Sequence, residues 1–292
     1  MRGAYDVPRD TPVSSTPAPL IVACLQTNAS RDVAQNLATV ARLAREAKDQ
    51  GADFIVTPEY VALFEPNAEA LPKAAEPWEG HSQLAAFATL ARELRVWMLA
   101  GSLHVRAPSG KAFNRSVLLD DTGRAVAHYD KIHLFDVTLA NGEDYRESDT
   151  FEAGGAATLA ETPWGTMGFT ICYDVRFPHL YRALAQAGAR MIVVPAAFTR
   201  TTGQAHWHVL LRARAIETGA FIVAPAQTGT HAEGRQTFGH SLVVDPWGNV
   251  LADGGEDVGV VTAKIDPALV DRARAQVPAW GRDVEIGGAG ER

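Results

Sequence analysis

Three side chains that could act together in nucleophilic catalysis are spread widely along the chain. Cys172 follows the apolar segment TMGFTI, Glu59 stands in TPEY, and Lys131 stands in HYDKIHLFD. A thiol can attack a carbonyl carbon, a carboxylate can accept the thiol proton, and a buried ammonium can stabilise the oxyanion that the attack creates. These residue types therefore supply a nucleophile, a base and a stabilising charge.

Each of the three residues also has an ordinary structural explanation. A free cysteine is most often a small buried hydrophobe, and a lysine at a strand end often extends its ammonium to solvent. A glutamate after a strand is commonly an exposed loop residue or a helix cap. Taken singly, each residue favours the structural explanation. Cys24, inside the apolar segment LIVACL, is expected to be a buried hydrophobe and nothing more.

The hydrophobic pattern indicates which elements must position these residues. Short apolar runs predict buried strands, over residues 20–25, 53–57, 96–100, 166–171, 190–194, 220–224 and 258–262. Apolar side chains at steps of three and four predict helices between them, over about 33–47, 84–94, 179–187, 205–217 and 267–276. This alternation predicts an α/β domain with helices covering the sheet faces.

Local signals refine this prediction. The segments SVLLDDTGRAVAHY and SLVVDPWGNVLAD are typical of β-hairpins. Ser30 is the expected N-cap of the first helix, and residues 130–156, which lack periodicity, are expected to form a long irregular loop. Cys172 would lie at a strand-to-helix turn, where the helix dipole favours a thiolate.

Length and composition exclude several classes of protein. The chain has 292 residues, of which 47% are hydrophobic and 21% charged, so it is neither disordered over most of its length nor collagen-like. The net charge of −7 is opposite to that of most nucleic-acid binders. No apolar run approaches the ~18 residues of a membrane span. We expect a cytoplasmic protein with no nucleic-acid or membrane partner, a flexible leader (1–18), one domain (19–280) and a C-terminal tail (281–292).

The motifs around Glu59, Lys131 and Cys172, taken in this order and context, resemble the catalytic set of the nitrilase superfamily of carbon–nitrogen hydrolases. The segments YRES, TTGQAHWHVLLRARAIETGAFIVAPAQ and FGHSLVVDPWG agree with this resemblance. They are most similar to the Nit branch, which contains deaminated glutathione amidases and ω-amidases. The resemblance covers roughly residues 19–280.

The resemblance implies a fold and a set of site residues. The fold would be an αββα sandwich of two mixed sheets flanked by helices. Cys172 would be the nucleophile, Glu59 the general base and Lys131 the cation beside the oxyanion. The second glutamate of the family's site corresponds to Glu147 in YRES, with Glu143 as the alternative.

Further residues are expected around this set. The backbone N–H of Tyr173 would be a second oxyanion donor, and Phe198 and Thr199 would form part of the pocket wall. Arg176 either binds a substrate carboxylate, as the matching arginine does in related N-carbamoyl amino acid hydrolases, or forms a structural ion pair with Asp174 or another acid. Three loops would set the pocket size, over residues 61–80, 137–150 and 228–237.

No metal or organic cofactor is expected. His206 and His208 look like a ligand pair, but residues two apart on a helix point roughly 200° apart and cannot share one ion. The chain has no HExxH motif and no glycine-rich phosphate loop. His133 and His240 are expected to be hydrogen-bonded structural histidines.

The expected activity is hydrolysis of a linear, carboxylate-bearing amide to an acid and ammonia. The preferred substrate is deaminated glutathione or a related ω-amide such as α-ketoglutaramate. The alternatives within the superfamily are an N-carbamoyl amino acid hydrolase and a nitrilase, and the alternative outside catalysis is a silent scaffold. Members of the Nit branch usually form homodimers, some enlarging to tetramers, and a homodimer is expected here.

Overall fold

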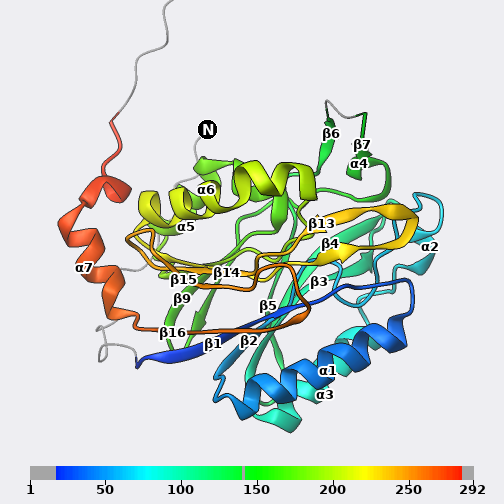
Figure 1. Cartoon of the computed structure of the whole chain (residues 1–292), viewed down its shortest axis with the longest axis horizontal. Coiled ribbons are helices and arrows are strands. Elements are labelled where there is room, and N and C mark those ends of the chain that lie inside the picture. Colours follow the sequence, from blue (N-terminus) through cyan, green and yellow to red (C-terminus); the bar gives the residue numbers. More distant parts are fainter. Residues whose placement is uncertain (1–17, 140–141, 285–292) are drawn as a thin grey trace, which may run out of the picture.

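Two six-stranded sheets stack face to face in the computed structural model, which describes residues 18–139 and 142–284. Helices cover the outer face of each sheet, so that the molecule has four layers, α, β, β and α (Figure 1). The expected αββα sandwich is therefore confirmed. The predicted leader, and the tail beyond residue 284, fall outside the described residues.

The first sheet has the strand order β16-β1-β2-β3-β4-β5. Strands β1, β2 and β3 are parallel to one another, and the other neighbours pair antiparallel. The first predicted hairpin forms the β4–β5 edge. The bounds are β1 (Leu20–Gln26), β2 (Phe54–Val56), β3 (Trp97–Arg106), β4 (Ala112–Leu119), β5 (Ala125–Asp130) and β16 (Gly259–Ile265).

The second sheet has the strand order β15-β14-β11-β10-β9-β8. Its central strands β9, β10 and β11 are parallel, and the second predicted hairpin forms the β14–β15 edge. The bounds are β8 (Leu159–Thr162), β9 (Gly165–Phe169), β10 (Met191–Val193), β11 (Phe221–Ala224), β14 (Leu242–Val244) and β15 (Val250–Asp253). A separate hairpin pairs β12 (Thr228–Thr230) with β13 (Gln236–Phe238).

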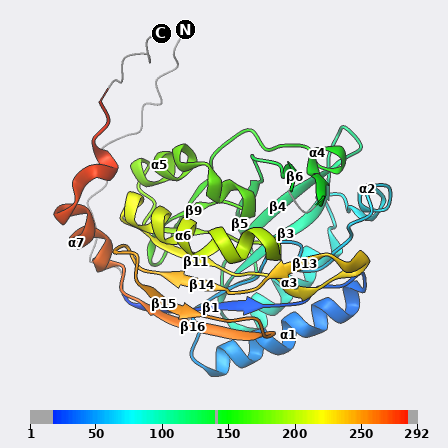
Figure 2. The ribbon, with the colours of Figure 1, turned by 45° about the horizontal axis from the view of Figure 1, so that its top comes forward.

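The helices divide between the two outer faces (Figure 2). Helices α1 (Val33–Asp49) and α3 (Ser82–Leu94) cover the first sheet, and α5 (Pro178–Gln186) and α6 (Arg200–Thr218) cover the second. Shorter elements are α2 (Leu71–Ala74), the 3-10 turn η1 (Cys172–Arg176) and α7 (Ala268–Gln276). Within the described part of the chain, no helix combines the length and apolar character needed to span a membrane.

The alternation of side chains along β1 explains the layered packing. Val22 and Cys24 point into the core between the two sheets, where they meet residues of the second sheet. Ala23 and Leu25 point the other way and pack with the apolar faces of α1 and α3. Because successive strand residues face opposite sides, one apolar strand serves both cores. Cys24 is fully buried, as expected.

One helix cap and one helix start differ from the prediction. Asp32, not Ser30, caps α1, because its carboxylate accepts the backbone N–H of Gln35. Helix α6 begins at Arg200 rather than near residue 205, since its first turn is polar and lacks apolar periodicity. Gly203 permits this early start, because the helix there lies directly against Phe238.

Residues 130–156 are not wholly irregular, contrary to the expectation. They contain a short antiparallel pair, β6 (Asp136–Thr138) and β7 (Asp144–Arg146), followed by one helical turn, α4 (Glu147–Thr150). These elements have three or four residues each, too few to produce a recognisable hydrophobic period. Their importance lies in the position that they give to Glu147.

Gly203→Ala tests the close contact between α6 and β13. The added methyl carbon would lie 2.4 Å from the Phe238 side chain, so we expect the free energy of unfolding in urea to fall by about 1–3 kcal/mol. Gly155→Ala is the matched control, because no atom lies within 4 Å of its added carbon. Equal stability of the two variants would contradict the packing described.

Candidate active site

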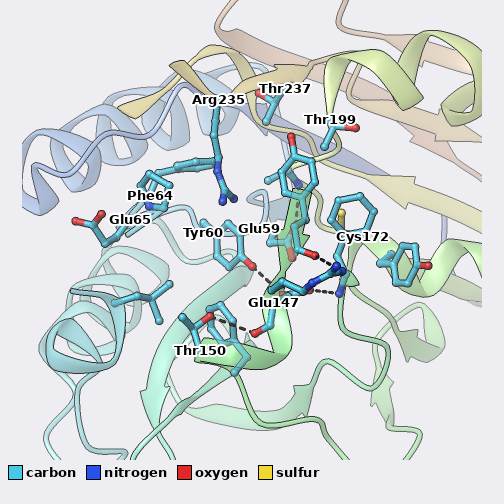
Figure 3. Close-up of a pocket in the computed structure, with 18 of the residues that line it drawn as sticks. Glu59, Tyr60, Phe64, Glu65, Glu147, Thr150, Cys172, Thr199, Arg235 and Thr237 are labelled. Carbon is cyan, nitrogen blue, oxygen red and sulfur yellow. Dashed lines mark hydrogen bonds between the residues drawn. The ribbon is translucent and has the colours of Figure 1, made fainter. Parts of the chain in front are cut away.

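A cavity opens where loops from both sheets converge (Figure 3). It is lined by residues that follow β2, by residues around α4 and by the residues near Cys172. The three loops expected to set the pocket size all contribute, through residues 64–71, 144–151 and 235–237. Glu59, Lys131, Glu147 and Cys172 all line this cavity, although they are separated by up to 113 residues in the sequence (172 − 59 = 113).

Lys131 is buried between two carboxylates. It directly follows β5, its side chain is 2% exposed, and its Nζ lies 2.9 Å from Oε1 of Glu59 and 2.8 Å from Oε2 of Glu147. Burial of a lone ammonium is costly, so this geometry depends on both acids. Glu147, rather than the alternative Glu143, is the second acid bonded to Lys131. Glu143 instead accepts a hydrogen bond from the Tyr145 hydroxyl.

Cys172 occupies the first position of η1, just after β9, with a positive φ of 47°. Such a backbone conformation is uncommon for a residue other than glycine and is held by its surroundings. The Cys172 N–H donates to Pro195 O at 2.9 Å, and its thiol lies close enough to the Glu59 carboxylate to feel its negative charge. Glu59 Oε1 lies 2.9 Å from Lys131 Nζ, and Glu59 Oε2 accepts the Ala197 N–H at 2.8 Å. Thus Glu59 adjoins both the thiol and the ammonium.

The electrostatic environment keeps the resting thiol neutral. Burial and, secondly, the negative charge of Glu59 raise the pKa of Cys172 well above its ordinary value, and Lys131 only partly opposes them. This corrects the expectation that the helix dipole favours a thiolate. For Lys131, burial alone would lower the pKa, but Glu147 and Glu59 outweigh it and the pKa is raised.

Two residues that the sequence did not suggest complete this polar cluster. Asn114, in β4, donates through Nδ2 to Glu59 Oε1 at 2.8 Å and lies 3.1 Å from Glu147 Oε1. The Tyr60 hydroxyl donates to Glu147 Oε1 at 2.8 Å. Burial and then the two glutamates raise the pKa of Tyr60. Tyr60 adjoins Glu59 in TPEY and could have been included for that reason, whereas nothing local marks Asn114.

Asp174 holds the turn that carries Cys172. This fully buried carboxylate accepts the Ile171 N–H at 2.8 Å and the Tyr129 hydroxyl at 2.8 Å, and Nδ1 of His133 lies 2.6 Å from it. His133 is therefore a hydrogen-bonded structural histidine, as expected. The contacts join the end of β5, next to Lys131, to the turn.

The predicted wall residues differ in their positions. Tyr173, Phe198 and Thr199 line the cavity. Arg176 is not among the lining residues: its guanidinium lies over the Phe198 ring, 5.1 Å from the centroid, and 3.2 Å from Nδ1 of His206. Among the described residues, Arg176 forms no salt bridge with Asp174, whose carboxylate bonds Ile171, Tyr129 and His133, or with another acid, so the structural ion pair considered for it is not observed.

One group of possible metal ligands lies outside the cavity lining among the described residues. Asp253 is 3.0 Å from Nε2 of His208 and 2.8 Å from Nδ1 of His240. His206 contacts Arg176 instead, which confirms that His206 and His208 do not share a partner. His240 is hydrogen-bonded, as expected.

Lys131→Met tests how far the site depends on its buried cation. The substitution leaves Glu59 and Glu147 facing each other, so we expect the free energy of unfolding to fall by about 3–5 kcal/mol at pH 7. Because acid conditions protonate carboxylates and so relieve their repulsion, we expect the deficit to be smaller at pH 5 than at pH 7. Urea unfolding at both pH values measures this. The exposed Lys264→Met is the control, and a pH-independent deficit below 1 kcal/mol would contradict the account.

A thiolate titration tests the charge state of Cys172. Because its pKa is raised, the difference in absorbance near 240 nm between the wild type and Cys172→Ala should stay flat up to the ordinary thiol value of about 8.5. Burial also raises the pKa of Cys24, so that thiol adds no early transition. A thiolate transition between pH 6 and 7 would contradict this electrostatic description.

Comparisons with known proteins agree with this geometry. The family model for carbon-nitrogen hydrolases matches residues 21–275. A deaminated glutathione amidase from Synechocystis sp. (strain PCC 6803 / GT-S) is 40% identical over 265 residues, which are 89% of this chain and 97% of that protein.

Solved structures share the fold. The Caenorhabditis elegans NitFhit protein has a TM-score of 0.86 at 34% identity, over 92% of this chain and 66% of that one. Saccharomyces cerevisiae Nit3, described as a member of branch 10 of the nitrilase superfamily, has a TM-score of 0.81 at 28% identity, over 91% of this chain and 97% of that one. The chain therefore belongs to the carbon–nitrogen hydrolase family, within the nitrilase superfamily.

Proposed function

We propose that this hydrolase is a cysteine-dependent amidase that acts on linear, carboxylate-bearing amides. The preferred substrate is deaminated glutathione, with related ω-amides such as α-ketoglutaramate next. One observation carries the proposal: the Cys172 thiol, the Glu59 carboxylate and the Lys131 ammonium meet in one cavity. The name of the Synechocystis relative supports the substrate.

The acylation half of the reaction follows from the contacts of Glu59. This carboxylate takes the thiol proton as Cys172 Sγ attacks the amide carbonyl carbon, which avoids a free thiolate in the resting enzyme. Lys131 and the backbone N–H of Tyr173 stabilise the tetrahedral oxyanion. Tyr173 lies in the first turn of η1, where helical N–H groups lack an intrahelical acceptor. One such donor contributes about 3 kcal/mol in the transition state.

The second half releases the product acid. Glu59 returns its proton to the departing nitrogen, which leaves a thioester on Cys172, and then deprotonates the water that hydrolyses this thioester. Glu147 keeps Lys131 charged and oriented throughout. Glutathione is a tripeptide with secondary amide bonds, so a deaminated form would release an amine. Ammonia would leave only from primary amides such as α-ketoglutaramate. The acid and ammonia expected from the sequence are therefore the products of primary amides only.

Two alternatives within the superfamily differ in their products. An N-carbamoyl amino acid hydrolase also releases carbon dioxide, and a nitrilase consumes two waters per nitrile. A silent scaffold would need no buried Glu59–Lys131–Glu147 arrangement. Burial of these charges costs free energy, and a scaffold without catalytic activity would gain nothing from it. The buried cluster therefore supports a catalytic function over a scaffold.

The proposal extends to the whole protein. We propose a single hydrolase domain over residues 19–280, a cytoplasmic location and a homodimer. Apolar side chains exposed on α6 and on the adjacent β14–β15 hairpin support self-association. They are Val209, Ile216, Trp247, Val250 and Leu251.

Product analysis with Cys172→Ala tests the function. We expect the wild-type enzyme to cleave deaminated glutathione and α-ketoglutaramate, and the variant to lose roughly 10⁴-fold or more in kcat, because no other group can form the acyl intermediate. Brief mixing with substrate and acid quenching should reveal a thioester on Cys172 by mass spectrometry. Cys24→Ala removes the other thiol, which lies in β1, and should retain turnover. Turnover by Cys172→Ala, or the lack of an acyl adduct on the wild type, would refute the proposal.

A further inference from the structure

We propose that Arg235 forms a carboxylate-binding subsite in the cavity wall and thereby selects anionic amides. This inference rests on the proposed amidase function, whose substrate class it explains. Arg235 lies in the loop before β13 and lines the same cavity as Cys172. Figure 3 shows its guanidinium directed into the cavity, on the side of the view away from Cys172.

The charges of the cavity wall single out this residue. Lysine and arginine line the cavity at three positions, Lys131, Arg146 and Arg235. Lys131 bonds two glutamates, and Arg146 lies 3.1 Å from Asp144. Among the residues that the structure describes, Arg235 forms no salt bridge with an acidic side chain. It is the lining cation whose charge the protein leaves available.

The reactive end of the cavity cannot bind a carboxylate by itself. Glu59 and Glu147 carry two negative charges against the single positive charge of Lys131, and the thiol of Cys172 is neutral at rest. A second carboxylate near these glutamates would be repelled. The carboxylate of an anionic substrate therefore requires a cation elsewhere in the cavity, and Arg235 supplies one.

The guanidinium of Arg235 is presented in a favourable orientation. Its central carbon lies 5.0 Å from the centroid of the Tyr145 ring. A guanidinium that rests on an aromatic face keeps its N–H edge free for a carboxylate, to which it can donate two parallel hydrogen bonds. The residue is half-buried, and partial removal from water strengthens such a pair.

The loop that carries Arg235 is fixed before any ligand binds. The backbone N–H of His231 donates to the carbonyl of Arg235 at 2.8 Å. The His231 ring stacks on Phe64 with a centroid separation of 4.0 Å, and its two nitrogens contact Ala29 O and Thr237 Oγ1. Such preorganisation lowers the entropic cost of ligand binding.

A salt-bridge clamp adds to this anchoring. Arg31 bonds both Glu65, in the cavity wall, and Glu233, at the tip of the loop. Glu65 and Glu233 are thereby neutralised by a residue other than Arg235. A further acid, Glu143, accepts a hydrogen bond from the Tyr145 hydroxyl.

Equilibrium binding in the Cys172→Ala background tests the subsite separately from turnover. The probes are two pairs in which a carboxylate is replaced by a neutral carboxamide: glutaramate with glutaramide, and deaminated glutathione with its C-terminal amide. We expect the parent variant to prefer the carboxylate by about 10- to 100-fold in Kd in one pair or both, the range of a charge-assisted hydrogen bond. Adding Arg235→Ala should reduce this preference to within about twofold.

The probe pair whose preference for the carboxylate is reduced by Arg235→Ala identifies which end of the substrate Arg235 binds. The control is Arg200→Ala in the same background. It removes an exposed charge on α6 that is paired with Glu256, and it should leave the preference for the carboxylate unchanged. Adding Arg176→Ala tests the rival arginine. Three results would overturn the subsite. The preference for the carboxylate could survive Arg235→Ala, it could be lost with Arg176→Ala instead, or it could be absent from the Cys172→Ala parent variant. Failure of the amidase function itself would appear separately, as absence of turnover by the wild type.

Discussion

The ion cluster of Lys131 with Glu59 and Glu147 is the constraint on which the site depends. Its three residues come from the turn after β2, the end of β5 and the first turn of α4. Each is almost completely buried, so none can lose a partner without leaving an uncompensated charge. The cluster therefore fixes the relative positions of three chain segments, and Asn114 and Tyr60 donate further hydrogen bonds to its carboxylates. Glu59 bonds Lys131 through Oε1 and the Ala197 N–H through Oε2, so that the proposed base is oriented by contacts at both oxygens.

The proposed catalytic groups come from both sheets, so the proposed activity would depend on the assembled sandwich. Glu59 follows a strand of the first sheet, and Cys172 follows a strand of the second. Gln227, which follows β11 of the second sheet, donates to the backbone carbonyl of Glu59 and forms an isolated bridge with Thr27, which follows β1 of the first sheet. Neither sheet alone could hold an acid beside a thiol. The shared core between the sheets is thus also the frame of the active site.

The neutral thiol of Cys172 and the excess of negative charge on the neighbouring glutamates affect different parts of a substrate. A buried thiol with a raised pKa is protected from adventitious reaction. In the proposed mechanism it would become a nucleophile only when a substrate carbonyl is in place and Glu59 can accept the proton. The excess of negative charge beside it would direct the anionic part of a substrate away from the reacting atoms. Arg235, stacked on Tyr145 and held by the His231 loop, provides the counter-charge at a distance. Charge separation along the cavity would then orient the amide with respect to Cys172.

Residue types and motifs in the sequence indicated the chemistry proposed for the site, and apolar runs with the two hairpin motifs predicted most of the strands and helices. Motif resemblance also indicated the sandwich and the set of Glu59, Lys131, Cys172 and Glu147. Packing alone shows that Glu147 rather than Glu143 contacts Lys131, because the placement of Glu147 depends on β6, β7 and α4, which are too short to leave a periodic pattern. Burial, which raises the pKa of Cys172, likewise arises from packing. Asn114 and Arg235 carry no local mark in the sequence, because their roles arise from contacts between segments that only packing brings together.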